Sequence, residues 1–307
     1  VRAATRTLIV STKTGQAQRP SSDEILQSMI NEMHRPFEMI RDNSASLLKS
    51  DIVHTGELLQ ILVDINTRAI KILEVKQDVL QLYNREKEME KLEDRFMEWK
   101  YEGIKYLSFV HGVSNLLLNG NIGELNDEQA EWIEKIEESS KNAIEHWHTI
   151  SEYFLVLSGT KVAELKKIDL HEVINAFLSE IEHTRKLPNQ ISVNLPDNLS
   201  QIKGDPSFLV RTINYLVYPD SIAYSSAKSF ATIEATYEEN SIKVHITTKM
   251  DSGDHISIKP DDFFLMTRPL LAKKMIEQHG SEIQMVVSNQ AIDFYFTLPV
   301  WNEIHAG

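Results

Sequence analysis

The pattern of apolar positions divides the chain into a long helical part and a shorter mixed part. From about residue 22 to Gly159 glycine is rare and no proline follows Pro36. Apolar residues there recur alternately at three and four positions, which predicts the buried seam of a helical bundle or coiled coil. The clearest stripe, for which core packing is the favoured interpretation, consists of Leu58, Leu62, Ile65, Ala69, Ile72, Val79 and Tyr83.

Two breaks in this pattern predict helical hairpins. The stretches "LLKSDIVHTGE" and "LLLNGNIGELNDEQ" each follow a Leu-rich helix end and precede a new helix. In the second stretch Gly120 and Gly123 suit the turn, and Asn126 or Asp127 can cap the next helix.

The two hairpins also resemble each other in sequence. Residues 26–48 align with residues 96–118, and one extra residue in the second loop keeps the returning helices in register. The alignment pairs Leu26 with Phe96, Glu32 with Glu102, Phe37 with Leu107, Ile40 with Val110, Leu47 with Leu117, Ile65 with Ile136, Ala69 with Ser140, and Val79 with Ile150. We interpret the helical part as two successive hairpins of one type.

After Gly159 the pattern changes to alternating strands and helices. "ISVNL", "FATIEATY" and "SIKVHITT" alternate as strands, and the end of the chain gives two more strands around "SNQ". Helical spacing is found in "DPSFLVRTINYLVYPDSIAYSS" and in "FFLMTRPLLAKKMIEQHG". The predicted fold class is therefore a mainly α N-terminal part, with helical hairpins in a four-helix bundle or coiled coil, followed by an α+β sandwich domain.

This reading divides the chain into five parts. We expect an N-terminal strand and linker at 1–21, a first hairpin at 22–83, a charge-rich coiled-coil connector at 84–100, a second hairpin at 101–160 and the α+β domain at 161–307. The hairpins suggest an elongated parallel homodimer. The tandem copies could instead complete a bundle within one chain if the helix breaks near 101–103.

Composition excludes several classes of function. The net charge of −13 disfavours nucleic-acid and anionic membrane partners, and no apolar run approaches the length of a membrane span. Zero cysteines exclude disulfides and thiolate metal sites and suit a cytoplasmic location. His146 and His148 flank Trp147 without the spacing or acidic neighbours of a metal site, so we expect no metal.

The order of parts resembles the transmitter half of bacterial sensor histidine kinases, in which a dimerising hairpin precedes a GHKL-type ATP-binding domain. The resemblance covers residues 22–300. Its most specific motif is "KKMIEQHGSEIQMVVSNQAIDFYFTLPV", which is similar to the family's closing helix, His-Gly turn and terminal hairpin. "IDLHEVI", "IKGDPSFLVRTINYL" and the loop "LLLNGNIGELNDEQ" resemble further landmarks.

The resemblance places the family's phosphoryl-accepting histidine at the opening of each hairpin, where this chain has other residues. The first hairpin reads "SMINEMHRPFEMI", with Asn31 at the acceptor position followed by Glu32 and Pro36. In the second hairpin the acceptor position falls on Tyr101, followed by Glu102. An amide nitrogen is not nucleophilic, and a phenol of pKa near 10 is a poor substitute for imidazole.

The nucleotide motifs that the resemblance implies are also replaced. The family's Mg²⁺-holding asparagine corresponds to Tyr218 or Asp220, next to Pro219. The adenine-reading aspartate corresponds to Thr248, and the second glycine motif of the lid corresponds to Met266, Thr267 and Arg268. Bulky side chains should obstruct the approach of phosphate to the backbone. We therefore expect no nucleotide cofactor.

The sequence thus predicts a degenerate histidine-kinase-like protein, a pseudokinase without a catalytic residue, that works by protein recognition. Its partner would be a response-regulator receiver or another histidine kinase, and the candidate partner-binding residues are Glu32, His34, Glu102 and His111. One rival is an ATP-independent phosphotransferase that uses His34 or His111. A second rival is a structural dimeric rod, and a residual kinase would require ATP.

Overall fold

The structure is a computed structural model that divides into two compact units. Unit 2 spans Ser21–Ser158, and unit 1 combines Val1–Pro20 with Gly159–Gly307. The residues described are 8–9, 34–49, 56–86, 89–122, 124–157, 159–184, 190–219, 229–250, 267–288 and 291–301.

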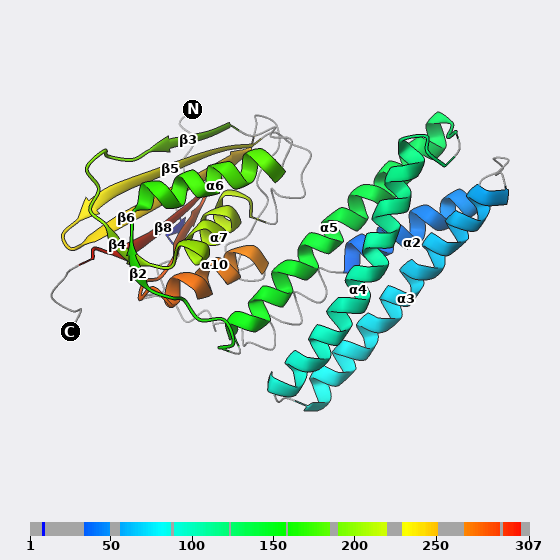
Figure 1. The fold of residues 1–307 in the computed structure, drawn as a ribbon, viewed down its shortest axis with the longest axis horizontal. Helices are drawn as coiled ribbons and strands as arrows, with labels where there is room; N and C mark the ends of the chain where they lie inside the picture. The colour runs from blue at the N-terminus through cyan, green and yellow to red at the C-terminus, as the bar shows by residue number, and fades with distance from the viewer. Residues whose placement is uncertain are drawn as a thin grey trace. The chain divides into compact units, whose positions relative to one another are not determined.

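Unit 2 is a bundle of four helices contributed by a single chain (Figure 1). The helices are α2 (His34–Lys49), α3 (Gly56–Glu86), α4 (Met89–Leu118) and α5 (Asp127–Leu157). Helix α2 packs against α3 and α5, and α4 packs against the same two helices. Of the two arrangements that the sequence left open, the structure has the intrachain bundle, but α4 runs unbroken through residues 101–103, where we expected this arrangement to require a break.

The core of the bundle follows the internal repeat. Positions related by the alignment of the two hairpins are buried in both copies, as Ile40 and Val110 are, each with no exposed surface. The other pairs that are buried on both sides are Phe37 with Leu107, Leu47 with Leu117, Ile65 with Ile136, and Ala69 with Ser140. Each hairpin therefore contributes an equivalent apolar stripe to one shared core.

The connections between the helices are short. Residues 84–100, which we expected to form a coiled-coil connector, contain the end of α3 at Glu86 and the start of α4 at Met89. Before α5, Asn126 Oδ1 accepts from the Gln129 backbone N at 2.9 Å, and Gln129 Oε1 accepts from the Asn126 N at 3.1 Å. This reciprocal pair confirms the predicted cap. The five-part division of the chain stays a prediction.

Unit 1 is built on a six-stranded sheet. Its strand order is β1-β7-β8-β6-β5-β3, and all neighbours are antiparallel except the parallel pair β3 and β5. These strands are β1 (Leu8–Ile9), β3 (Gln190–Asn194), β5 (Ser229–Glu238), β6 (Ser241–Met250), β7 (Gln284–Val287) and β8 (Ala291–Pro299). The short strands β2 (Lys166–Ile168) and β4 (Ile202–Gly204) form a separate pair.

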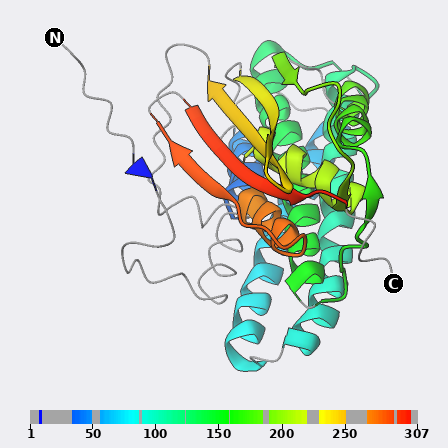
Figure 2. The ribbon, with the colours of Figure 1, turned by 90° about the vertical axis from the view of Figure 1, so that its left-hand side faces the viewer.

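Three helices cover one face of this sheet (Figure 2). They are α6 (Leu170–Thr184), α7 (Pro206–Val217) and α10 (Thr267–Glu277). Along β6 the residues Ile242, Val244 and Ile246 are buried and join a core cluster with side chains from all three helices. The intervening residues of β6 are only partly buried, which is the alternation of a sheet packed on one side.

The fold class predicted from the sequence is confirmed: a mainly α N-terminal part precedes an α+β domain. Within the described ranges no helix is both long and apolar enough to cross a membrane.

Candidate functional site

The sequence-predicted residues of the first hairpin fall at the edge of what the structure describes. Asn31 and Glu32 of this hairpin lie outside the described residues. Asp220, a candidate position of the nucleotide motif, also lies outside them. His34 is the first residue of α2, but its side chain is not described. Pro36 lies in the first turn of α2, where proline is tolerated because the first backbone N–H groups of a helix have no partner within the helix.

The second hairpin places its candidate residues along α4. Tyr101 is 70% exposed, which is unusual for a large aromatic side chain, and Glu102 beside it is partly buried. His111 lies ten residues further on, about 15 Å along the helix axis. The structure therefore does not bring Tyr101, Glu102 and His111 into one cluster.

His111 faces a carboxylate on the neighbouring helix. Its Nδ1 atom lies 3.2 Å from Glu137 Oε1 of α5, and the side chains are 32% and 23% exposed. The Nδ1 atom is itself buried, and the contact has the distance of an ion pair but not the angles of a hydrogen bond. The exposed 32% of the His111 side chain therefore does not include Nδ1.

Three of the described nucleotide-motif positions, Tyr218, Thr248 and Arg268, are brought together at the C-terminal end of α7. Arg268 Nη1, from the start of α10, donates to the Tyr218 backbone O at 3.2 Å. Thr248 Oγ1, near the end of β6, lies 3.3 Å from the Leu216 O and 3.5 Å from the Val217 O. Tyr218, Thr248 and Arg268 are 2%, 0% and 4% exposed.

This cluster has the chemistry of a helix cap. The last carbonyl groups of a helix have no partner within the helix and carry a partial negative charge. Here a hydroxyl and a guanidinium group from two other elements donate to the last carbonyls of α7 and of its C-cap residue Tyr218. The side chains thus face the protein backbone and are withdrawn from solvent.

A second polar node, which the sequence did not predict, joins α7 to the end of α10. Asp205 caps α7, because its Oδ1 accepts from the backbone N of Ser207 at 2.8 Å and of Phe208 at 3.1 Å. The Asp205 N donates to His279 Nε2 at 3.0 Å, and His279 Nδ1 lies 2.7 Å from the Met275 O. The motifs "IKGDP" and "EQHG" were visible in the sequence, but their contact was not.

The pKa values of Asp205 and His279 both lie below the ordinary values of these side chains. Burial raises the pKa of Asp205, but hydrogen bonds from Glu164, Phe208 and Ser207 outweigh it and lower the pKa below its ordinary value. Burial lowers the pKa of His279 against the opposing effect of its hydrogen bonds and of Asp205. The neutral His279 imidazole, with Nδ1 donating and Nε2 accepting, fits both of its contacts.

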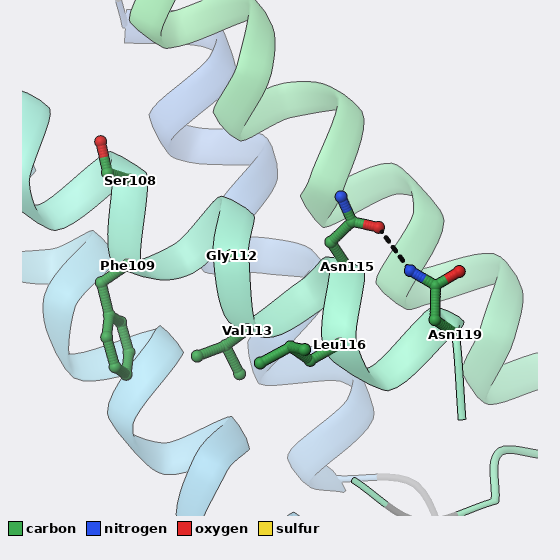
Figure 3. A pocket seen from close by; sticks show the side chains of 7 residues that line it. All are labelled: Ser108, Phe109, Gly112, Val113, Asn115, Leu116 and Asn119. Atoms are coloured by element: carbon green, nitrogen blue, oxygen red, sulfur yellow. Dashed lines mark hydrogen bonds between the residues drawn. The ribbon is translucent and has the colours of Figure 1, made fainter. Parts of the chain in front are cut away.

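A hollow of about 570 Å³ lies on the outward side of α4 (Figure 3). Every residue that lines it belongs to α4 or to the turn after it, and the apolar ones are Phe109, Val113 and Leu116. Gly112 also lines it, and Asn119 Nδ2 donates to Asn115 Oδ1 at 2.9 Å. Within the described ranges no group of three or more His, Cys, Asp or Glu side chains could hold a metal ion.

Comparison with solved structures finds histidine kinases. Full-length ShkA in complex with AMPPNP aligns over 68% of this chain and 46% of its own, with 13% identity and a TM-score of 0.48. The histidine kinase AdeS from Acinetobacter baumannii aligns over 63% of this chain and 96% of its own, with 12% identity and a TM-score of 0.46. ThkA, in complex with the response regulator protein TrrA, aligns over 74% and 67%, with 15% identity and a TM-score of 0.45.

The chain spans less than half the length of full-length ShkA. No protein-family model matches the sequence, and comparison with curated proteins gives no match.

Proposed function

We propose that the chain is a histidine-kinase-like signalling protein that has lost ATP chemistry and acts by binding another protein of a two-component-type pathway. The partner would be a response-regulator receiver or a true histidine kinase. The observation that carries this proposal is the burial of Tyr218, Thr248 and Arg268 against the end of α7. Thr248 and Arg268, which are buried and donate to backbone carbonyl groups, are poorly placed to hold Mg²⁺, adenine or phosphate.

The acceptor positions support the same proposal. Asn31 offers no nucleophile, and the phenol of Tyr101 lies on an exposed helix surface. A tyrosine needs a neighbouring base to act as a nucleophile at neutral pH. The residues proposed for partner binding remain Glu32, His34, Glu102 and His111.

Two further expectations stay predictions. A homodimer would need a surface other than the bundle core, because the four helices already bury one another's stripes within one chain. A cytoplasmic location, expected from the lack of cysteine, also stays a prediction.

Titration of the intact chain with a fluorescent ATP analogue and Mg²⁺ tests the proposal. We expect no saturable signal, while an active histidine kinase in the same buffer serves as the positive control. Saturable binding in the micromolar range would contradict it. In a parallel titration with unphosphorylated receiver domains we expect saturable binding, whereas a purely structural rod would give none.

A second candidate function is an ATP-independent phosphotransferase that uses His111. The contact of Nδ1 with Glu137 and the partial exposure of the His111 side chain favour it. In such a step the Nε2 lone pair would attack the phosphorus of a receiver's aspartyl phosphate. The bond from phosphorus to the aspartate oxygen would break and return the aspartate as a free carboxylate, while Glu137 would hold the imidazole by Nδ1.

Incubation with a phosphorylated receiver distinguishes the two candidates. The phosphotransferase predicts acid-labile phosphate on the chain that disappears in His111→Gln and is reduced in Glu137→Gln. The non-catalytic proposal predicts no label in any of these proteins, although the receiver still binds.

A further inference from the structure

Strand β1 covers one edge of the six-stranded sheet, and it comes from a distant part of the sequence. It lies at the end of the strand order, next to β7 (Figure 2). Leu8 pairs with Val287 and Ile9 with Val286 in antiparallel register. In the sequence all of unit 2, Ser21–Ser158, stands between β1 and the rest of unit 1. The release of β1 would therefore leave the pairing of the remaining strands unchanged.

The pairing of β1 with β7 is short. Strand β7 pairs with β8 through all four of its residues, Gln284–Val287, whereas the described pairing with β1 involves only the last two. A strand held at a sheet edge by so few backbone hydrogen bonds belongs to the part of a fold that opens most easily. When β1 opens, backbone N–H and C=O groups of β7 lose their partners on that side.

The strand that β1 covers has none of the features that keep an exposed edge from pairing. Natural sheets protect their edges with charged side chains, proline or bulges. Strand β7 reads "QMVV" and contains no charged residue, proline or glycine. Met285 and Val287 pack against the core, while Val286 pairs with Asp293 of β8 and so lies on the opposite face. Without β1, this strand is a template for another strand.

The other edge of the sheet does not offer the same contacts. Strand β3 forms that edge, and its residues Gln190, Ser192 and Asn194 are exposed and lie on one face. Cross-strand contacts between apolar side chains are a main source of sheet stability. Pairing through β3 would bring polar side chains together, so we expect no association through this edge.

From these observations we infer that β1 is a strap that prevents β7 from pairing with β7 of a second copy of this chain. The two β7 strands pair antiparallel about a two-fold axis at Val286. This register places Val286 opposite Val286 of the second copy, and Met285 opposite Val287. A second copy fits because apolar residues then meet at each of these positions and the core-facing side chains of both sheets stay on one face.

This inference goes beyond the proposed function, because it concerns self-association and requires no other protein. With β1 in place the chain is a monomer, since both the bundle core and the β7 edge are occupied within one chain. Withdrawal of β1 converts it into a dimer through the sheet. The N-terminal strand thus controls the oligomeric state of the chain.

Light scattering of the intact chain with both residues of β1 replaced tests the strap. Leu8→Pro with Ile9→Pro removes both backbone N–H groups of the strand. We expect a mass of about twice 35.2 kDa, at concentrations where the unaltered chain stays near 35.2 kDa. The matched control is Gln16→Pro with Ala17→Pro, outside β1, which should stay monomeric. Addition of Val286→Lys to the β1 variant should restore the monomer, because like charges directly opposite each other destabilise a strand pair.

Hydrogen exchange separates the possible failures of this test. If the β1 variant stays monomeric while exchange in β7 becomes faster, the uncovered edge does not associate and the inference is overturned. Unchanged exchange in β7 would show that β1 does not protect that strand, which overturns it equally. Self-association that survives Val286→Lys lies on another surface and also contradicts it.

Introduced cysteines test the register, because the chain contains none of its own. In the β1 variant, Val286→Cys should form a disulfide between two chains under mild oxidation, with a yield at least about tenfold above that of Val286→Cys with β1 intact. The control Ser192→Cys, on the β3 edge, should give no such crosslink in either background. In the otherwise unaltered chain, Ile9→Cys with Val286→Cys should close within one chain. Equal interchain crosslinking from position 286 with and without β1, or from position 192, would overturn the inference.

Discussion

Two glycines of α4 show how the surroundings of a single residue decide the effect of a methyl group. A Cβ added at Gly103 would lie 2.9 Å from Cζ2 of Trp147, a ring that is 1% exposed. A Cβ added at Gly112, nine residues along the same helix, would meet nothing within 4 Å. Helix propensity favours alanine equally at both positions, so packing alone separates them.

We expect Gly103→Ala to lower the free energy of unfolding by about 1–2 kcal/mol, because a rigid buried ring must move. Gly112→Ala should raise it by about 0.5–1 kcal/mol, because alanine loses less backbone entropy on forming a helix. Urea denaturation of both variants followed by circular dichroism measures the difference. Equal effects at the two positions would contradict the packing of Trp147 against α4.

The burial of His279 predicts a dependence of stability on pH. Its pKa in the folded chain lies below the value of about 6.5 for an exposed histidine. As the pH falls below about 6.5 the unfolded chain takes up a proton that the folded chain resists, so the free energy of unfolding decreases until the folded pKa is reached. The stabilising effect is fully present at pH 7 and above.

We therefore expect the stability of the unaltered chain to decrease between about pH 7 and pH 5 more steeply than that of His279→Gln, which lacks the titrating group. Unfolding by urea at several pH values measures both slopes. Parallel slopes would show that His279 is accessible to protons in the folded state.

At the scale of secondary-structure elements, α7 is capped at its start by the preceding residue and at its end by side chains from β6 and α10. Asp205 caps its start and also accepts from the Glu164 backbone N through Oδ2 at 2.8 Å. At its end Thr248 and Arg268 donate to carbonyl groups of the helix and of Tyr218. The helix is thereby tied to β6 and to α10, so residues at positions that the family resemblance assigns to nucleotide binding stabilise the end of a helix here.

Asp205→Ala should lower the free energy of unfolding of unit 1 by about 1–2 kcal/mol, the usual cost of a lost N-cap. Asp205→Asn should cost less, because the amide oxygen can still accept from Ser207 and Phe208. Hydrogen exchange in α7 reports the local change for both variants. If asparagine and alanine are equivalent, the carboxylate and not the cap geometry carries the effect.

At the scale of the whole molecule, the two tandem hairpins pack against each other within a single chain. Each hairpin presents an apolar stripe that needs a partner, and the second copy follows the first in the same sequence. Two segments held together by a short connection associate at a high effective concentration. The intrachain bundle therefore forms more readily than a bundle between two chains.

Because the stripes are satisfied internally, the bundle core by itself predicts a monomer in dilute solution, whereas the homodimer suggested by the sequence requires a further interface. Light scattering coupled to size exclusion should give a mass near 35.2 kDa across a tenfold range of protein concentration. A mass twice as large at all concentrations would support the homodimer that the sequence suggested, with an interface outside the bundle core.

The sequence alone determined the fold class and the internal repeat, because periodicity and residue identity are local properties. Ile40 and Val110 could be paired from spacing alone, and both are buried. Tertiary structure alone decided that the hairpins share one core, that Arg268 and Thr248 bond to the same end of α7, and that Asp205 meets His279. These three hydrogen bonds join residues 32 to 74 positions apart. Their partners are selected by packing between elements, which an apolar stripe requires but does not specify.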